Sequence, residues 1–244
     1  MSEIGGVWRT IGGRRVFIKD GQDLASAMKE SGKFTVRNIE YKENPNIKTS
    51  EKFDKTIDAK ISKDIMQYTN ELYQEYSDIL PARTIIWKTF VTKKTELANS
   101  NYNLNPSLAN NYNDFIKLIV HNQDLGQLVK TDNPIKQIVA HEVGHNVQTE
   151  LYKKVSMDKI KSQKGADKYT KKMMMRVVDR FEQENPNIMI REAVSEYGAE
   201  NYYELFSEAF AEYTSSKTPR PFAQIFGIIL EEEREKIHDK SLDQ

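Results

Sequence analysis

Hydrophobic residues recur at every third or fourth position along much of this chain, which is the spacing of one face of an amphipathic helix. One such run, from Phe53 to Tyr76, predicts a long core helix. A second begins at Pro134, a residue suited to a first helical turn, and continues to about Tyr152. The pattern predicts a last helix over residues 222–238. The second run carries an apolar stripe that should face the core: Val139, Val143, Val147 and Leu151.

Shorter segments have the composition of strands and loops. Segments rich in β-branched and aromatic residues are predicted as strands at 7–11, 14–18, 83–91 and 115–121. The first two flank Gly12-Gly13, as in a tight hairpin, and a short helix should follow and end before Gly32. Residues 40–52 are polar and predict a linker, and the asparagine-rich residues 99–113 predict a loop.

Composition excludes several classes of function. The chain has 244 residues, with 36 Lys+Arg against 36 Asp+Glu, so no overall field attracts nucleic acid or an anionic membrane. It has no cysteine, which excludes disulfides and thiol regulation. Its longest apolar runs are about five residues, its N-terminus lacks the apolar core of a signal peptide, and a membrane span needs about 20 apolar residues. We expect a cytoplasmic protein, a virion-associated one, or one exported by a non-classical route.

The sequence His141-Glu142-Val143-Gly144-His145 carries the clearest chemistry. On a helix, residues four apart share a face, so both imidazoles can reach one metal ion. Zinc accepts imidazole nitrogens, and Glu142 would serve as general base toward an attacking water. The alternative is a pair of ordinary histidines. Gly144 weakens a helix by about 1 kcal/mol relative to alanine, and either simple tolerance or close packing of another element explains it.

A catalytic zinc site needs a third protein ligand. Because the chain has no cysteine, and its other histidines are only His121 and His238, a carboxylate is the expected ligand. We interpret His121 as a polar residue at the end of a strand. Glutamates recur every four residues beside an apolar face that contains the small Ser207 and Ala211: Glu200, Glu204, Glu208 and Glu212. A solvated acidic face is the alternative, and spacing alone does not choose between Glu204 and Glu208 as the ligand.

The two motifs together resemble the lethal-factor-like group of gluzincin zinc metallopeptidases, over about residues 115–215. That family has the downstream pattern Tyr-Gly-(x)5-Glu-x-Phe-(small)-Glu-(small)-Phe, with Ser207 here where alanine is more common. The resemblance implies that Glu204 is the third ligand and that Tyr197 stabilises the transition state. It also implies that Glu208 lies behind the ligands and accepts the free N–H of a ligating histidine.

This resemblance implies an α+β, zincin-like fold over residues 50–240, with a small sheet over the histidine-bearing helix and a mainly helical second half. By analogy, residues 115–121 would be the strand at the cleft that pairs with extended substrate. The expected activity is that of a Zn²⁺-dependent endopeptidase acting on a protein. Residues 152–176, rich in lysine and methionine, are interpreted as mostly a solvated helical face with one or two methionines facing the core, and a basic lid is the alternative.

Residues 1–40 are expected to form a separate attachment module. Their hairpin sequence resembles a small module attached to phage minor head proteins, which implies phage structural proteins as partners of residues 1–34. Two other functions stay open. One is a virion assembly protein whose zinc site only joins two helices, and the other is a toxin or effector peptidase delivered into another cell. Glu142 argues against the first, because a structural site has no use for a general base.

Overall fold

Helices make up the part of the chain that the structure describes in full. In this computed structural model, side chains are described for residues 57–81, 111–156 and 161–237, and the backbone alone for the strands and for the end of the last helix. The helices are α2 (Ala59–Glu75), α4 (Tyr112–Asp124), α5 (Pro134–Val155), α6 (Gln163–Glu184), α7 (Ile190–Ala193), α8 (Tyr202–Ser215) and α9 (Pro221–Leu242), with a 3-10 turn, η1 (Gly198–Glu200).

The strands are short and paired in two groups. An antiparallel hairpin joins β1 (Gly6–Ile11) to β2 (Arg14–Lys19). The others follow the order β3-β4-β5-β7-β6, in which β4 pairs with β5, and β5 with β7, in parallel. Their bounds are β3 (Val36–Asn38), β4 (Ser50–Asp54), β5 (Thr84–Thr89), β6 (Ala98–Asn99) and β7 (Asn103–Leu104). The helix expected before Gly32 lies outside the described residues.

The expected α+β fold, with a sheet over the histidine-bearing helix, is wrong. Every residue whose side chain is described lies in a helix or in a segment that links helices, and none lies in a strand, so the described fold is helical. Residues 115–121, expected as the cleft strand, belong to helix α4. Asn111 caps that helix by accepting a hydrogen bond from the Asp114 amide at 3.2 Å, and the buried Phe115, Ile119 and Gln123 repeat every four residues.

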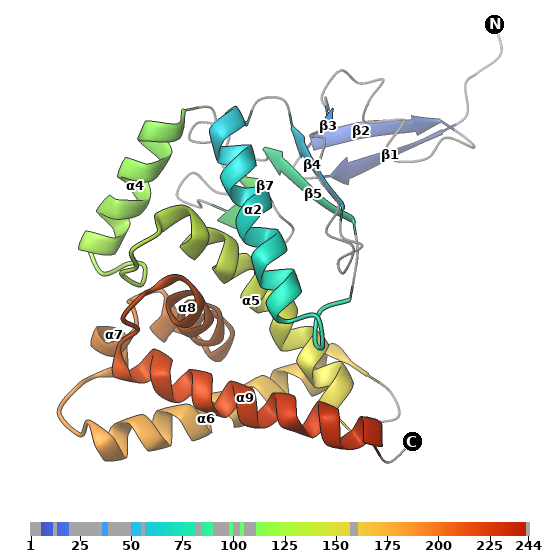
Figure 1. The fold of residues 1–244 in the computed structure, drawn as a ribbon. Coiled ribbons are helices and arrows are strands. Elements are labelled where there is room, and N and C mark those ends of the chain that lie inside the picture. The colour runs from blue at the N-terminus through green and yellow to red at the C-terminus, as the bar shows by residue number, and fades with distance from the viewer. Residues whose placement is uncertain are drawn as a thin grey trace, which may run out of the picture.

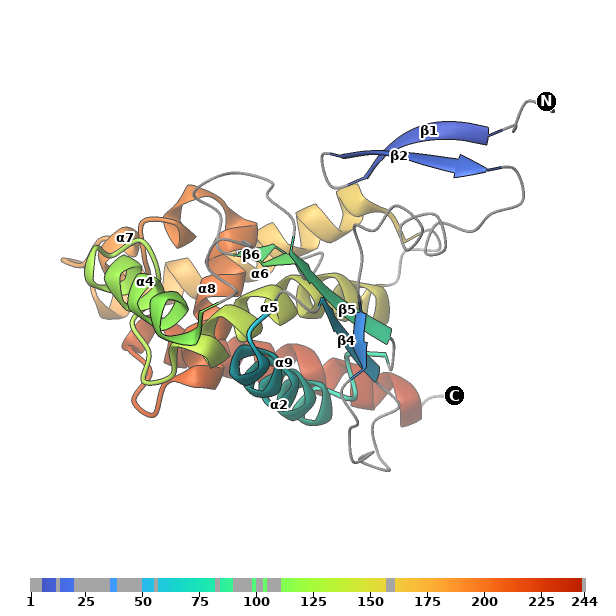
Figure 2. The ribbon, with the colours of Figure 1, turned by 90° about the horizontal axis from the view of Figure 1, so that it is seen from above.

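Helix α5 is the central element. Figure 1 shows it passing through the helical body, and it packs most extensively against α8 and α2. Helices α6 and α9 pack against each other and complete the helical body, which Figure 2 shows from above. The apolar stripe predicted for α5 is confirmed as core, because each of its members is fully buried: Val139, Val143, Val147 and Leu151.

Local sequence fixes where the helices that carry the site begin. Asn133 caps α5 by accepting from the Lys136 amide at 3.0 Å, and Pro134 follows as the first helical residue. Asn201 caps α8 by accepting from the amides of Tyr203 at 2.9 Å and Glu204 at 3.1 Å. The second cap matters most, because it places Glu204 in the first turn of α8.

Gly144 lies where α8 crosses α5. A Cβ at this position would stand 3.1 Å from the Ser207 Cα and 3.3 Å from the Phe210 ring, which is tighter than ordinary contact. Close packing of α8 therefore explains the glycine, and simple tolerance does not. The small Ser207 and Ala211, both fully buried, allow this approach from the side of α8.

The core-facing methionines expected in the lysine- and methionine-rich segment are confirmed. Its second half is the start of α6, where Met173 and Met174 are buried in the core and Met175 is exposed. Helix α6 packs against α9 and α8 as a structural element. No helix in the described part of the chain is long and apolar enough to cross a lipid bilayer.

Candidate metal centre

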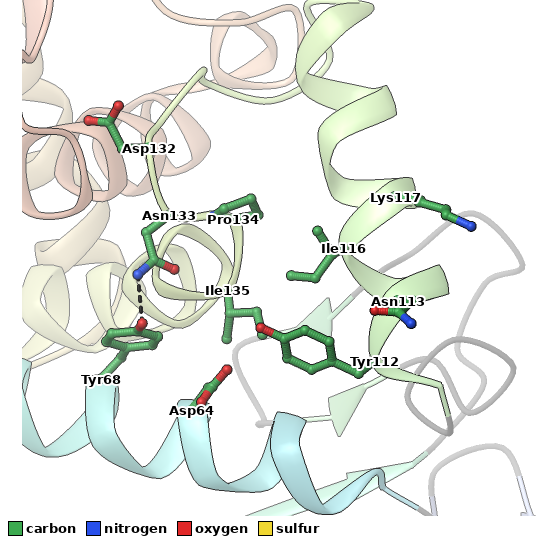
Figure 3. A pocket seen from close by; sticks show the side chains of 10 residues that line it. All are labelled: Asp64, Tyr68, Tyr112, Asn113, Ile116, Lys117, Asp132, Asn133, Pro134 and Ile135. Atoms are coloured by element: carbon green, nitrogen blue, oxygen red, sulfur yellow. Dashed lines mark hydrogen bonds between the residues drawn. The ribbon is translucent and has the colours of Figure 1, made fainter.

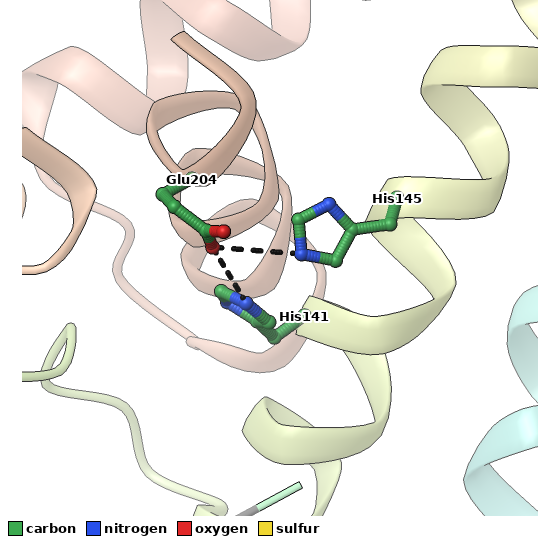
Figure 4. Close-up of side chains that lie close together, drawn as sticks. All are labelled: His141, His145 and Glu204. Carbon is green, nitrogen blue, oxygen red and sulfur yellow. Dashed lines mark ion pairs between the residues drawn. The ribbon is translucent and has the colours of Figure 1, made fainter. Parts of the chain in front are cut away.

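Two histidines from α5 and one glutamate from α8 converge at the crossing of these helices (Figure 4). The Oε2 atom of Glu204 lies 3.2 Å from Nε2 of His141 and 3.5 Å from Nε2 of His145. One ligand atom from each residue lies within 4.8 Å of the other two. The three side chains are between 10% and 19% exposed, so the group is mostly buried but still in contact with solvent. His141, His145 and Glu204 could therefore hold a metal ion.

The second nitrogen of His141 is also engaged. Its Nδ1 lies 2.8 Å from Oε1 of Glu208, a carboxylate with no exposed surface. Because an ionised carboxylate only accepts, the Nδ1–H must donate to it, which leaves a lone pair on Nε2 of the neutral ring. That lone pair faces Oε2 of Glu204, a buried oxygen with no hydrogen-bond donor. Only a cation, either a proton or a metal ion, makes this arrangement favourable.

The pKa values follow from the same contacts. Burial alone would lower the pKa of His141, but the carboxylates of Glu204 and Glu208 outweigh it and raise this pKa well above its usual value. Burial is the largest effect at His145 and lowers its pKa, which favours the neutral imidazole that a metal needs. At Glu204, burial opposes ionisation, but the nearby rings of His141 and His145 lower the pKa and favour the charged carboxylate.

Glu208 sits in a complete set of donors. One of its oxygens faces His141, and the other accepts from the Val129 amide at 2.8 Å and from the Ser195 hydroxyl at 2.9 Å. A fully buried charge is retained only when it is paired and hydrogen-bonded, and here it has donors on both oxygens. Glu208 therefore holds the ring of His141 in one orientation and in one tautomer.

Glu142 and Tyr197 lie at the same centre. Glu142 follows His141 in α5 and is only 4% exposed, and its charge raises the pKa of both His141 and Tyr197. The Tyr197 ring centroid is 5.7 Å from that of His141, and this tyrosine is 37% exposed. Burial, and then the charge of Glu204, raise the pKa of the Tyr197 hydroxyl, so it remains a proton donor at neutral pH.

The glutamate repeat is not a solvated acidic face. Glu200 is exposed in η1, but Glu208 and Glu212 are buried to 0% and 1% exposure. Glu212 accepts two hydrogen bonds at 2.8 Å from the guanidinium of Arg220. Glu208 and Glu212 thus lie deeper than Glu204, and each of the three has a different set of partners.

Sequence reasoning missed three contributors to the centre. Ser195 and the Val129 amide hold Glu208, and Asn201 begins the helix at Glu204. Asn201 had a readable signal, since asparagine before a helical repeat is a typical cap. The contacts of Ser195 and Val129 had none, because both join segments distant in the sequence.

Other features lie away from this centre. His121 is an exposed residue of α4, and the side chain of His238 is outside the described residues. A separate pocket of about 470 Å³ lies between α2, α4 and the start of α5 (Figure 3). It is lined by Asp64, Tyr68, Tyr112, Asn113, Ile116, Lys117, Asp132, Asn133, Pro134 and Ile135, and none of these is among the residues of the centre.

A scan of protein-family models finds no family that matches this chain, and searches of the curated proteins and of the solved structures find no match. The gluzincin resemblance therefore stays an expectation from two motifs. Any statement of function rests on the geometry and chemistry of the centre itself.

Proposed function

We propose that this chain is a zinc-dependent endopeptidase whose centre comprises His141, His145 and Glu204. The observation that carries the proposal is that three electron-rich atoms face one another, two imidazole Nε2 atoms and one carboxylate oxygen. Glu208 also holds His141 in the tautomer that binds a metal ion. With a neutral His141 such a group is unfavourable, because a lone pair faces a carboxylate, and a cation between these atoms, either a proton or a metal ion, makes it favourable.

Zinc fits this donor set better than other common ions. Calcium and magnesium prefer oxygen ligands, whereas two imidazoles with one carboxylate form a familiar catalytic zinc set. Tetrahedral zinc with bonds of about 2.0–2.1 Å separates its ligand atoms by roughly 3.3 Å. The distances of 3.2 and 3.5 Å from Glu204 to the two histidines bracket that value.

A zinc site with three protein ligands is typical of a catalytic site rather than a structural one, because it leaves a coordination position for water. When bound, zinc supplies a water of lowered pKa and polarises the peptide carbonyl. Glu142, buried beside His141, takes the proton of the attacking water and passes it to the leaving amine. Tyr197 donates its hydroxyl hydrogen to the oxygen on which negative charge develops.

The test combines metal analysis with hydrolysis of a library of fluorescence-quenched peptides. The purified protein should hold one zinc ion per chain, and His141→Ala should lose it. Glu142→Gln should retain zinc and fold, but lose hydrolysis by several orders of magnitude, because an amide cannot accept the water's proton. Glu150→Gln, an exchange of the same kind further along α5, is the matched control and should leave both properties intact.

Two results would contradict the proposal in different ways. If the protein binds no stoichiometric metal, the centre is not a metal site. If it binds zinc but hydrolyses every peptide as slowly as Glu142→Gln does, the zinc site is not catalytic and only joins two helices.

A further inference from the structure

We infer that Ser195 is a positioning residue of this centre, because one hydroxyl holds both the turn that carries Tyr197 and the carboxylate that orients His141. This inference rests on the proposed peptidase function. Ser195 lies outside the candidate ligand set, and the gluzincin resemblance assigns it no role.

The hydroxyl of Ser195 is fully used. Ser195 is 1% exposed, its Oγ donates to Oε2 of Glu208 at 2.9 Å, and it accepts from the Gly198 amide, also at 2.9 Å. The direction of each bond is fixed, since an ionised carboxylate cannot donate and an amide N–H cannot accept. The hydrogen of this hydroxyl must therefore point at Glu208.

The same residue closes the turn around Tyr197. The Ser195 carbonyl accepts from the Ala199 amide at 3.1 Å, so side-chain and backbone bonds of Ser195 both span Tyr197. Gly198 presses this turn against the centre, because a Cβ there would lie 3.1 Å from the Ser195 Oγ and 3.2 Å from the Glu208 Cβ. The position of the Tyr197 ring against His141 thus depends on a turn that is itself bonded to Glu208.

The flanks of the turn are anchored to other parts of the body. The Glu196 amide donates to the Gly126 carbonyl at 2.8 Å, and Arg220 donates to the Val194 carbonyl at 2.7 Å. These contacts fix the path of the backbone. The hydroxyl of Ser195 adds a link from this backbone to the ligand His141, through Glu208.

Ser195→Ala should therefore weaken two properties together. Glu208 would lose one of its donors, and the orientation of His141 would loosen, for which we expect about 10-fold weaker zinc binding, the lower end of the effect of removing a group behind a metal ligand. The turn would also lose its side-chain bond, so kcat should fall by about 10-fold while KM stays unchanged, since Tyr197 acts on the transition state.

The decisive experiment is a double-mutant cycle in zinc affinity, measured by competition with a chromogenic chelator. The four proteins are wild type, Ser195→Ala, Glu208→Ala and the double variant. If Ser195 acts through Glu208, its substitution costs affinity in the wild type and nothing further when Glu208 is absent. Equal losses in both backgrounds, or no loss in either, would overturn the inference.

Controls separate positioning from general destabilisation. Ser215→Ala removes a different buried hydroxyl, at the end of α8, which donates to the Ala211 carbonyl, and it should leave zinc affinity and kcat unchanged. If Ser195→Ala does not fold, Ser195→Cys keeps the shape but supplies a weak donor and should show the same loss of zinc affinity. A Ser195→Cys protein with wild-type affinity would contradict the inference.

A second measurement does not depend on zinc. In metal-free protein labelled with ¹⁵N-histidine, the Nδ1–H of His141 should give a signal protected by its bond to Glu208, and Ser195→Ala should shift it and speed its exchange with water. If wild-type protein binds no zinc, the proposed function fails, while this signal still tests the link from Ser195 to His141. An unchanged signal in Ser195→Ala would refute that link.

Discussion

At the scale of single residues, the ring of Tyr197 is the only exposed aromatic group among the described residues that lie against the candidate centre. It is 37% exposed and lies 5.7 Å from the ring of His141. Its hydroxyl keeps its proton, because burial and the charge of Glu204 raise its pKa. A group of this kind can bind a developing oxyanion without titrating first.

Tyr197→Phe should therefore lower kcat by about 10²–10³-fold with little change in KM or zinc content. Steady-state kinetics on a cleaved library peptide and metal analysis of the same preparation measure these three quantities. Tyr202→Phe, in the same segment, is the matched control. A silent Tyr197→Phe variant would mean that the ring only packs at this position.

Residue spacing in the sequence predicts much of the centre, but it does not choose between the two candidate glutamates. The four-residue spacing of His141 and His145 predicted a shared face, and the two rings lie 5.0 Å apart. Glu204 and Glu208 also share a face, so spacing could not rank them, and the assignment of Glu204 came from the family pattern. What separates them in the structure is depth, with side-chain exposures of 17% and 0%. Depth depends on how two helices cross, which no local pattern encodes.

At the scale of elements, the crossing of α5 and α8 depends on Gly144. Alanine there would gain up to about 1 kcal/mol in helix propensity, but its Cβ would stand 3.1 Å from backbone of α8. Backbone yields less readily than a flexible side chain. We expect Gly144→Ala to lower the free energy of unfolding by about 1–3 kcal/mol and to weaken zinc binding, because α8 carries Glu204.

Urea unfolding of metal-free protein and chelator competition measure the two effects of Gly144→Ala separately. A rise in stability would show that helix propensity outweighs the contact. In that case, α8 approaches α5 less closely than the structure has it.

The pairing of α6 with α9 should depend on pH. Burial alone would raise the pKa of Glu233, but bonds from Lys236 and Tyr169 and the charge of Arg176 lower it below its usual value. A carboxyl group with a lowered pKa stabilises the fold above the pKa of the unfolded chain, about 4.5. This stabilisation is lost as the pH falls through the pKa of the folded protein.

Glu233→Gln should therefore destabilise metal-free protein by about 1–2 kcal/mol at pH 7. The effect is no larger because Arg176 and Lys236 are partly exposed, so solvent screens their attraction to Glu233. The difference from wild type should shrink as the pH falls below about 4.5. Urea unfolding at a series of pH values measures it. A difference that stays constant down to pH 3 would assign the effect to packing.

Helix α4 shows why one element was predicted wrongly. Its sequence, Phe-Ile-Lys-Leu-Ile-Val from Phe115 to Val120, is rich in strand-forming residues. A short run of apolar residues fits either a buried strand or a buried helix, because its periodicity does not distinguish the two. The cap at Asn111 and the burial of Phe115, Ile119 and Gln123 decide for the helix. The sequence alone could have identified Asn111 as a cap, but it could not show that these three residues are buried.

At the scale of the whole molecule, a bound ion would join α5 to α8, and its removal should weaken the fold as a unit. Metal that binds only the folded state adds about 4 kcal/mol of stability at a thousand times its Kd. For a chain of this size, stripping zinc with a chelator should lower Tm by roughly 10 °C. His145→Ala should melt at the same temperature with and without chelator.

Calorimetry on both proteins provides the measurement of Tm. An equal drop in His145→Ala would place the stabilising ion elsewhere. No drop in either protein would argue against metal binding by the folded chain.

The fold as a whole was predicted less well than its centre. Helical periodicity located α5 and α9, because each buries an apolar stripe. It located α2 except at its start, because the predicted helix began at Phe53, which lies in β4, whereas α2 begins at Ala59. The expected sheet over α5 came from family analogy, and the described body is helical instead. The attachment of residues 1–34 to phage proteins stays a prediction, since only the backbone of β1 and β2 is described there.

The order of the candidate ligands along the chain has a consequence for synthesis. The histidines lie on α5 and Glu204 on α8, with all of α6 and α7 between them. A ribosome therefore delivers two imidazoles long before the carboxylate that completes the group. A growing chain cannot assemble the full ligand set until α8 has left the exit tunnel and docked. Any activity of this centre then begins only after α8 has been made and has docked on α5, and fragments cut within α6 each lack part of the group.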